Sequence, residues 1–234
     1  MTPLTELAHT LVRAVLQPGD IAIDATAGNG HDTQFLAECV GPTGNVYSFD
    51  IQPAALAVTS VRLAAASLNN VILLPRNHAQ MPSALQNVRP GTVTAVMLNL
   101  GYLPGGDKRL TTQTASTITA IRDGLTLLAP GGIMTIVAYP GHRGGADEAA
   151  GVERFLNELS PTEFGGLKRG QVHLTAVAAS KWTCPLCSSP TMGFDAAWAS
   201  DMNHLLTLSS VANSWTGDAW RNSRSKLALR RNMC

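Results

Sequence analysis

Several features that would assign the chain to a special class of protein are missing or scarce. No run of about 18 apolar residues occurs, and the first residues lack a basic segment followed by an apolar core, so we expect no contact with a membrane. The four cysteines, Cys39, Cys184, Cys187 and Cys234, are too few and too unevenly spaced for a disulfide framework in 234 residues. We therefore expect reduced thiols and a cytoplasmic location.

Charged residues are also scarce, at 14% of the chain against 45% hydrophobic residues. A chain of this length and composition can bury one sizeable core, which favours one domain plus an appendage. Residues 1–170 carry 11 Lys and Arg against 13 Asp and Glu, whereas residues 171–234 carry 6 against 3. The main body is not globally basic, so a nucleic acid would have to bind a local patch.

Apolar runs alternate with amphipathic segments along the first 170 residues. We expect strands at 21–23, 46–50, 70–75, 93–98 and 133–139, and helices at 5–16, 33–39, 53–68, 82–87, 111–128 and 147–159. This alternation predicts a three-layer α/β domain with a mostly parallel sheet over residues 1–170. The carboxyl ends of the strands then meet at one edge of the sheet, where a ligand should bind.

The loop after the first expected strand contains Gly28 and Gly30. A glycine loop at a helix N-terminus directs backbone N–H groups toward a cofactor, which makes it a candidate cradle. An ordinary strand-to-helix connection, with Asp32 or Thr33 near the cap, explains it equally well. The loop lacks the third glycine of the Gly-x-Gly-x-x-Gly pattern, which argues against a nicotinamide-dependent oxidoreductase.

Polar residues also follow the next two strands. Asp50 ends the second expected strand about twenty residues beyond Gly30, where an acid can accept both ribose hydroxyls of a bound nucleoside. It could equally cap the helix that begins near Pro53. Asn77 and His78 follow the third strand, at the adenine end of such a pocket, although ordinary loop polarity explains them too.

The loops after the fourth and fifth strands are rich in glycine and proline. The first runs from Asn99 to Lys108 and the second from Pro140 to Gly145. Ordering such a segment costs conformational entropy, so we favour a functional interpretation over a strand-end turn at Asn99. His142 lies in the second loop. It is either a functional residue of the site or a loop histidine without a role.

Four segments, Asp24–Thr33, Phe49–Gln52, Asn99–Lys108 and Tyr139–Gly145, together resemble the YtqB-like rRNA methylases. That family includes a tRNA 5-aminomethyl-2-thiouridine methyltransferase. The resemblance covers residues 1 to about 170 and implies a Rossmann-like class I methyltransferase fold that uses S-adenosylmethionine. The implied reaction methylates the exocyclic amine of 5-aminomethyl-(2-thio)uridine at the wobble position, so the implied partner is a tRNA anticodon stem-loop; a homodimer is left open. Ribosomal RNA or a small molecule as substrate, or non-catalytic binding of RNA or S-adenosylmethionine, are the alternatives.

The resemblance also implies roles for particular residues. Asn99 Oδ1 and the Leu100 carbonyl would accept the two hydrogens of the amine, as in the Asn-Pro-Pro-Tyr loop of amino-group methyltransferases, although Leu-Gly replaces Pro-Pro here. Tyr102 would stack on the base, and His142 would deprotonate the ammonium form or contact a phosphate. The expected cofactor-binding residues are Asp24, Thr26, Gly28, Asn29, Gly30, Asp32, Thr33, Asp50, Gln52, Asn77, His78 and Leu100.

Basic residues and the C-terminal segment are less informative. Lys108, Arg109 and Arg143 could meet the anticodon backbone or could simply be solvated. After residue 170 only the run 172–177 is strand-like, and the segment 171–234 departs from the family pattern. It is interpreted as a divergent tail, partly disordered, and a frameshift or fusion would also explain it. Its Cys-x-x-Cys pair lacks a second pair at suitable spacing, so we expect no metal site. We interpret its basic terminus as a solvated tail rather than an RNA-binding segment.

Overall fold

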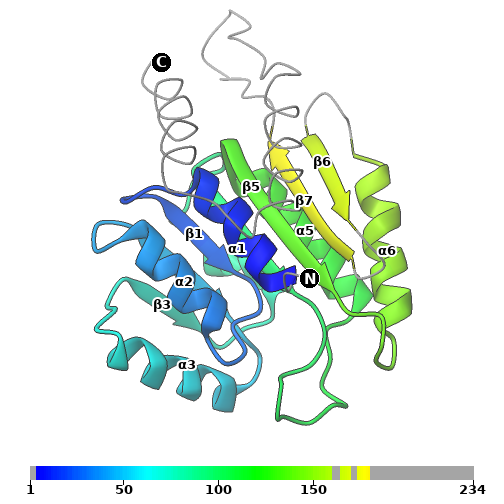
Figure 1. Ribbon diagram of the computed structural model, residues 1–234, viewed down its shortest axis with the longest axis horizontal. Helices are drawn as coiled ribbons and strands as arrows, with labels where there is room; N and C mark the ends of the chain where they lie inside the picture. Colours follow the sequence, from blue (N-terminus) through cyan, green and yellow to red (C-terminus); the bar gives the residue numbers. More distant parts are fainter. Residues whose placement is uncertain (1–3, 160–163, 170–172, 180–234) are drawn as a thin grey trace, which may run out of the picture. The chain divides into compact units, whose positions relative to one another are not determined.

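The computed structural model describes residues 4–159, 164–169 and 173–179, and these residues form a sheet of seven strands in the order β3-β2-β1-β4-β5-β7-β6 (Figure 1). The strands are β1 Ile21–Asp24, β2 Asn45–Phe49, β3 Val71–Leu74, β4 Val93–Asn99, β5 Leu128–Ala138, β6 Phe164–Arg169 and β7 His173–Ala179. β1 to β5 pair in parallel, and β7 runs antiparallel to both of its neighbours. The predicted mostly parallel sheet is confirmed.

Helices cover both faces of the sheet. α1 Leu4–Val15, α2 His31–Val40 and α3 Pro53–Ala65 lie on one face, and α5 Thr114–Leu127 and α6 Gly145–Asn157 lie on the other (Figure 1). The short helices η1 His78–Gln80 and α4 Met81–Ala84 contact α5. α2 packs against β1, β2 and α3, whereas α5 packs against η1, α4 and α6. The predicted three layers are therefore present. None of the helices in the described part of the chain is long and apolar enough to cross a membrane.

The core lies along the central strands. β4 is buried from Val93 to Leu98, and Val93, Val96 and Leu98 belong to one cluster with Ile23, Phe49 and Met134. Burying one such side chain contributes about 1.5–3 kcal/mol. α1 adds a buried stripe at the helical spacing of Leu7, Ala8, Leu11, Val12 and Val15. This packing holds the strands, and therefore the loops at their carboxyl ends, in a fixed arrangement.

Two parts of the last strands differ from the prediction. β5 begins at Leu128 rather than at the predicted residue 133, and Pro130–Gly132 lie inside the strand where its register with β4 shifts. β6 was not predicted, since its sequence contains two glycines, which are depleted in strands. β7 corresponds to the strand-like run predicted at 172–177, so the sheet continues past residue 170.

The division of the chain at residue 170 stays a prediction. All the described residues fall within one compact unit. The Cys184–Cys187 pair and the basic terminus, in contrast, lie outside the described residues.

Candidate active site

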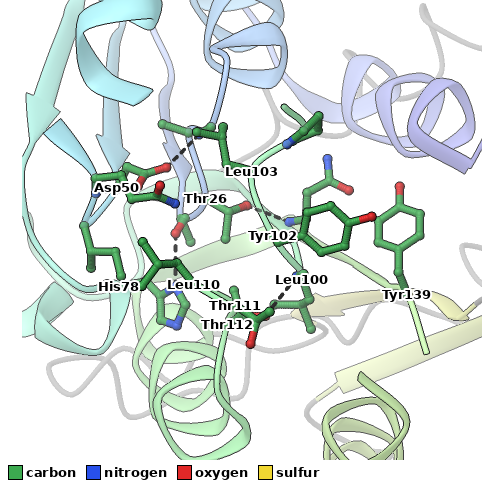
Figure 2. Close-up of a pocket in the computed structure, with 18 of the residues that line it drawn as sticks. Thr26, Asp50, His78, Leu100, Tyr102, Leu103, Leu110, Thr111, Thr112 and Tyr139 are labelled. Atoms are coloured by element: carbon green, nitrogen blue, oxygen red, sulfur yellow. Dashed lines mark hydrogen bonds between the residues drawn. The ribbon is translucent and has the colours of Figure 1, made fainter. Parts of the chain in front are cut away.

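A cavity of about 1290 Å³ opens where β1 to β5 end (Figure 2). β1 lies between β2 and β4, so the direction in which strands are added reverses there, and ligands bind at such a switch point in open α/β sheets. The structure brings most of the predicted site residues together around it: Thr26, Gly28, Asn29, Asp32, Asp50, Gln52, Asn77, His78, Asn99, Leu100, Tyr102 and His142. Asp24, Gly30 and Thr33 do not line the cavity.

Asp24 and Thr33 lie beneath the glycine loop. The fully buried Asp24 carboxylate accepts hydrogen bonds from the Thr26 N–H at 3.0 Å and from Thr33 Oγ1 at 2.6 Å. Gly30 has φ 79°, and a side chain there would lie 2.8 Å from Thr59, so its lack of one lets the loop approach α3. These three residues shape the loop from below.

Burial raises the pKa of Asp24 from 3.8 to about 7, and the nearby charge of Asp32 adds to this effect. The hydrogen bonds from Thr33 and Thr26 oppose it, and the charge of Asp50 adds a smaller increase. The folded protein therefore holds a proton on Asp24 that the unfolded chain releases. Between about pH 4 and 7 only the unfolded chain loses this proton, so the free energy of unfolding falls as the pH rises.

The Asp24→Asn substitution should remove this pH dependence of stability, because asparagine does not titrate. Relative to the variant, the wild-type protein should lose about 1–3 kcal/mol of unfolding free energy between pH 5 and pH 8. Denaturant unfolding of both proteins at the two pH values measures this difference. The contribution of histidine titration is nearly the same in both proteins and therefore largely cancels in the difference. That cancellation matters because burial lowers the pKa of His78, which acts in the opposite direction. Parallel pH profiles for the two proteins would show that Asp24 is ionised throughout.

Asp50 ties the glycine loop to the start of α3. Its Oδ2 accepts the Gly28 N–H at 2.9 Å, and its Oδ1 accepts the Gln52 N–H at 2.8 Å. Each carboxylate oxygen keeps a further lone pair for a ligand hydroxyl. Beside it, Ile51 is 54% exposed and lines the cavity, an apolar surface that the sequence reasoning missed.

His78 and Asn77 differ in whether a side-chain acceptor remains for a ligand. His78 Nδ1 lies 3.2 Å from the Ala25 carbonyl, which can only accept, so Nδ1 carries the proton and Nε2 is an acceptor. Nε2 is buried and has no hydrogen-bond partner within the described residues. Asn77 instead uses its side-chain oxygen to cap η1, accepting the Ala79 N–H at 2.8 Å.

Asn99 ends β4 at the centre of the cavity wall. Its N–H donates to Thr26 Oγ1 at 2.7 Å, and its Nδ2 donates to Asp32 Oδ2. Its Oδ1 is buried and lacks a hydrogen-bond partner in the described part of the chain. Leu100 continues the wall, with its N–H donating to the Val137 carbonyl at 2.8 Å.

The loop after Asn99 folds back against the glycine loop. Leu103 lies 3.5 Å from the position of a side chain built at Gly28, and Asn29 Nδ2 approaches the Pro104 carbonyl at 3.4 Å. The two loops therefore line one cavity. The residues predicted to bind the cofactor and those predicted to hold the amine face the same space (Figure 2).

A buried acid supports this loop from α6. The Gly101 N–H donates to Thr112 Oγ1 at 2.9 Å, and Thr112 Oγ1 donates to Glu148 at 2.6 Å. Glu148 also accepts a hydrogen bond from Thr117 Oγ1 at 2.6 Å and is only 2% exposed. The sequence reasoning missed this support, because Glu148 is simply a polar residue in an expected helix.

His142 is the third cavity-lining residue, after His78 and Asn99, with a buried acceptor that has no partner among the described residues. Its Nδ1 lies 3.1 Å from the Arg143 carbonyl, so this nitrogen carries the proton, and Nε2 is buried and unpaired among the described residues. The ring packs edge-on against Tyr102, with 5.8 Å between centroids. Tyr139, to which the sequence analysis assigned no role, lines the same wall, and burial together with the charge of Asp32 raises its pKa.

The basic residues near these loops have different surroundings. Lys108 Nζ lies 5.7 Å from the centroid of the Tyr102 ring, and Arg109 forms an ion pair with Asp107 at 2.7 Å. Arg143 is exposed. Among the residues that the structure describes, no group of three or more His, Cys, Asp or Glu side chains could hold a metal ion.

The sequence and the fold of this chain match those of known proteins. The profile of the family described as "Putative rRNA methylase" matches residues 46–180. A crystal structure described as "putative rRNA-methylase" from Clostridium thermocellum is 34% identical, with a TM-score of 0.72 over 76% of this chain and 98% of that one. The chain belongs to the rRNA methylase family.

Two further relatives refine the comparison. A protein described as "a putative methyltransferase" from Streptococcus mutans, solved in complex with SAH, is 33% identical with a TM-score of 0.68, over 76% of this chain and 99% of that one. The chloroplastic tRNA (mnm5s2U34)-methyltransferase of Arabidopsis thaliana is 40% identical over 68% of this chain and 61% of its own length. The predicted Rossmann-like methyltransferase fold is confirmed, while the chain spans about three fifths of this plant relative.

Proposed function

We propose that the chain binds S-adenosylmethionine in the cavity and transfers its methyl group to the exocyclic amine of 5-aminomethyl-(2-thio)uridine at the wobble position of tRNA. The observation that carries the proposal is the buried Oδ1 of Asn99 in the wall of the cavity, which has no hydrogen-bond partner among the described residues. An acceptor in this position suits a substrate that brings N–H groups. The name of the plant relative supports the tRNA substrate, and family membership and the SAH in the Streptococcus structure support methyl transfer from S-adenosylmethionine.

The residues present fit the proposed cofactor. The remaining lone pairs of Asp50 suit two ribose hydroxyls, and the exposed Ile51 offers an apolar face for a purine. His78 Nε2, a buried acceptor to which no described residue donates, suits the exocyclic amine of adenine. When bound, the cofactor supplies an electrophilic methyl group on a sulfonium sulfur. The glycine loop, from Thr26 to Asn29, would hold its methionine end.

On the acceptor side, the residues orient an amine and manage its proton. An amine attacks only when it is unprotonated. His142 Nε2, which has no hydrogen-bond partner in the described part of the chain, can take a proton from the ammonium form. Asn99 Oδ1 and the Leu100 carbonyl would then accept the two N–H groups, which leaves the nitrogen lone pair directed at the methyl group. Tyr102, 36% exposed at the cavity, offers a ring on which the base can stack.

The RNA itself would be held outside the cavity. Lys108 and the exposed Arg143 flank the acceptor loops and suit phosphate contacts of an anticodon stem-loop, whereas Arg109 is already paired with Asp107. A cytoplasmic location accompanies this substrate as part of the proposal, and a homodimer is left open.

The test is methylation of tRNA from cells that accumulate the aminomethyl intermediate. The full chain is incubated with S-adenosylmethionine carrying a labelled methyl group, and nucleosides are identified by mass spectrometry. We expect label on the methylaminomethyl nucleoside, with no labelling of ribosomal subunits offered in parallel. Label in ribosomal RNA alone, or tight cofactor binding by calorimetry with no labelled RNA, would overturn the tRNA substrate.

A further inference from the structure

Asp32 joins two elements that are far apart in the sequence. It lies in the first turn of α2 with its side chain 8% exposed. Its Oδ1 is 2.6 Å from His9 Nε2 of α1, and its Oδ2 accepts the hydrogen bond from Asn99 Nδ2. Each oxygen of this carboxylate is therefore engaged by a different residue, and the Asn99 amide forms one end of the chain of contacts.

The chemistry of this contact fixes which way the Asn99 amide faces. A carboxylate can only accept hydrogen bonds, so Asn99 must present its NH2 group to Asp32. The amide is planar, and its Oδ1 is consequently the atom left free for a ligand. The helix N-terminus at Asp32 favours the negative charge on which this selection depends.

His9 is itself held in place. Its ring stacks on the buried Phe35, with centroids 3.9 Å apart and planes 3° from parallel. Stacking leaves the imidazole little freedom to rotate, so Nε2 stays directed at Asp32. His9, Asp32 and Asn99 thus form one hydrogen-bonded row that ends at the cavity.

We propose that His9 and Asp32 are positioning residues, which hold the Asn99 amide so that Oδ1, and never Nδ2, faces the acceptor amine. This inference rests on the proposed function and gives Asp32 a role other than cofactor binding. If the amide were flipped, Nδ2 would donate to the lone pair of the amine and block its attack. A flipped amide would therefore slow methyl transfer without weakening the binding of S-adenosylmethionine.

The test measures kcat for tRNA methylation together with the Kd for S-adenosylmethionine. Asp32→Asn has nearly the same shape but can pair with either orientation of Asn99. We expect kcat to fall about 10- to 100-fold while the Kd changes less than about threefold. His9→Phe keeps a ring against Phe35 but removes the hydrogen bond, and should lower kcat by about 3- to 10-fold.

A swapped pair provides the sharper test. Asn99→Asp alone places two carboxylates in contact and should be nearly inactive. Combining it with Asp32→Asn restores an amide–carboxylate pair and always leaves an oxygen facing the cavity, so the double variant should exceed both single variants in kcat. Asp147→Asn is the matched control, because it removes an exposed acid from the first turn of α6.

The outcomes separate this inference from the proposed function. Wild-type protein that methylates no tRNA contradicts the proposed function itself. An active wild type with unchanged kcat in Asp32→Asn and His9→Phe overturns the positioning role. A rise in Kd with kcat retained would identify Asp32 as a cofactor residue and overturn it equally.

Discussion

Replacing Asn99 by alanine is expected to lower kcat for tRNA methylation by about 10²- to 10³-fold, with the Kd for S-adenosylmethionine changed less than about threefold. Asn99 Oδ1 is the buried acceptor that orients the amine in the proposed reaction, and alanine has no atom in its place. The nitrogen lone pair is then no longer aimed, which costs rate rather than cofactor affinity. Single-turnover methylation and calorimetry measure the two quantities separately.

The same substitution also leaves Asp32 Oδ2 without the Asn99 hydrogen bond, which should cost about 1–3 kcal/mol of stability. Thermal unfolding therefore accompanies the kinetics, so that loss of folded protein is not mistaken for loss of catalysis. Asn87→Ala is the matched control, because Asn87 is exposed and does not line the cavity. Unchanged turnover in folded Asn99→Ala would remove Asn99 from the proposed mechanism.

The position of the site could be predicted because it follows from local patterns. Short apolar runs such as Ile21–Ile23 form buried parallel strands, and polar or glycine-rich residues follow each of them. Once the strands are parallel, their carboxyl ends must share an edge. Asp50, Asn99 and His142 therefore reach one cavity although they are far apart in the sequence.

What the sequence could not reveal depends on contacts between distant elements. His9 and Asp32 lie 23 residues apart on two helices, and only the packing of α1 beside α2 brings them to 2.6 Å. Glu148 reaches Thr112 in the same way, from a helix that reads as an ordinary amphipathic segment. Neither pair has a spacing that a periodicity argument could detect.

The glycine loop shows where a motif is informative and where it is not. Its glycines and acids correctly located the cavity, but the motif did not separate residues that face the ligand from those that hold the loop. Asp24 and Thr33 bond to each other below it, whereas Gly28 and Asn29 line the cavity. Direction of a side chain is set by backbone turns, which composition does not specify.

Asp50→Ala is expected to raise the Kd for S-adenosylmethionine by about 10²-fold or more, because two charge-assisted hydrogen bonds to the ribose would be lost. The substitution also frees the Gly28 and Gln52 N–H groups, so a loosened loop could contribute. Asp147→Ala, which removes an exposed acid, should leave the Kd unchanged.

An analogue of S-adenosylmethionine without the ribose 2′-hydroxyl distinguishes these two causes. If Asp50 binds the ribose, the wild-type protein should bind the analogue about 10-fold more weakly than the natural cofactor, whereas Asp50→Ala should bind both alike. If Asp50 only fixes the loop, the variant should show the same preference as the wild type, since the hydroxyl would still meet its real partner. Equal discrimination by the two proteins would therefore move the ribose site away from Asp50 and leave this carboxylate as the tie between the glycine loop and α3.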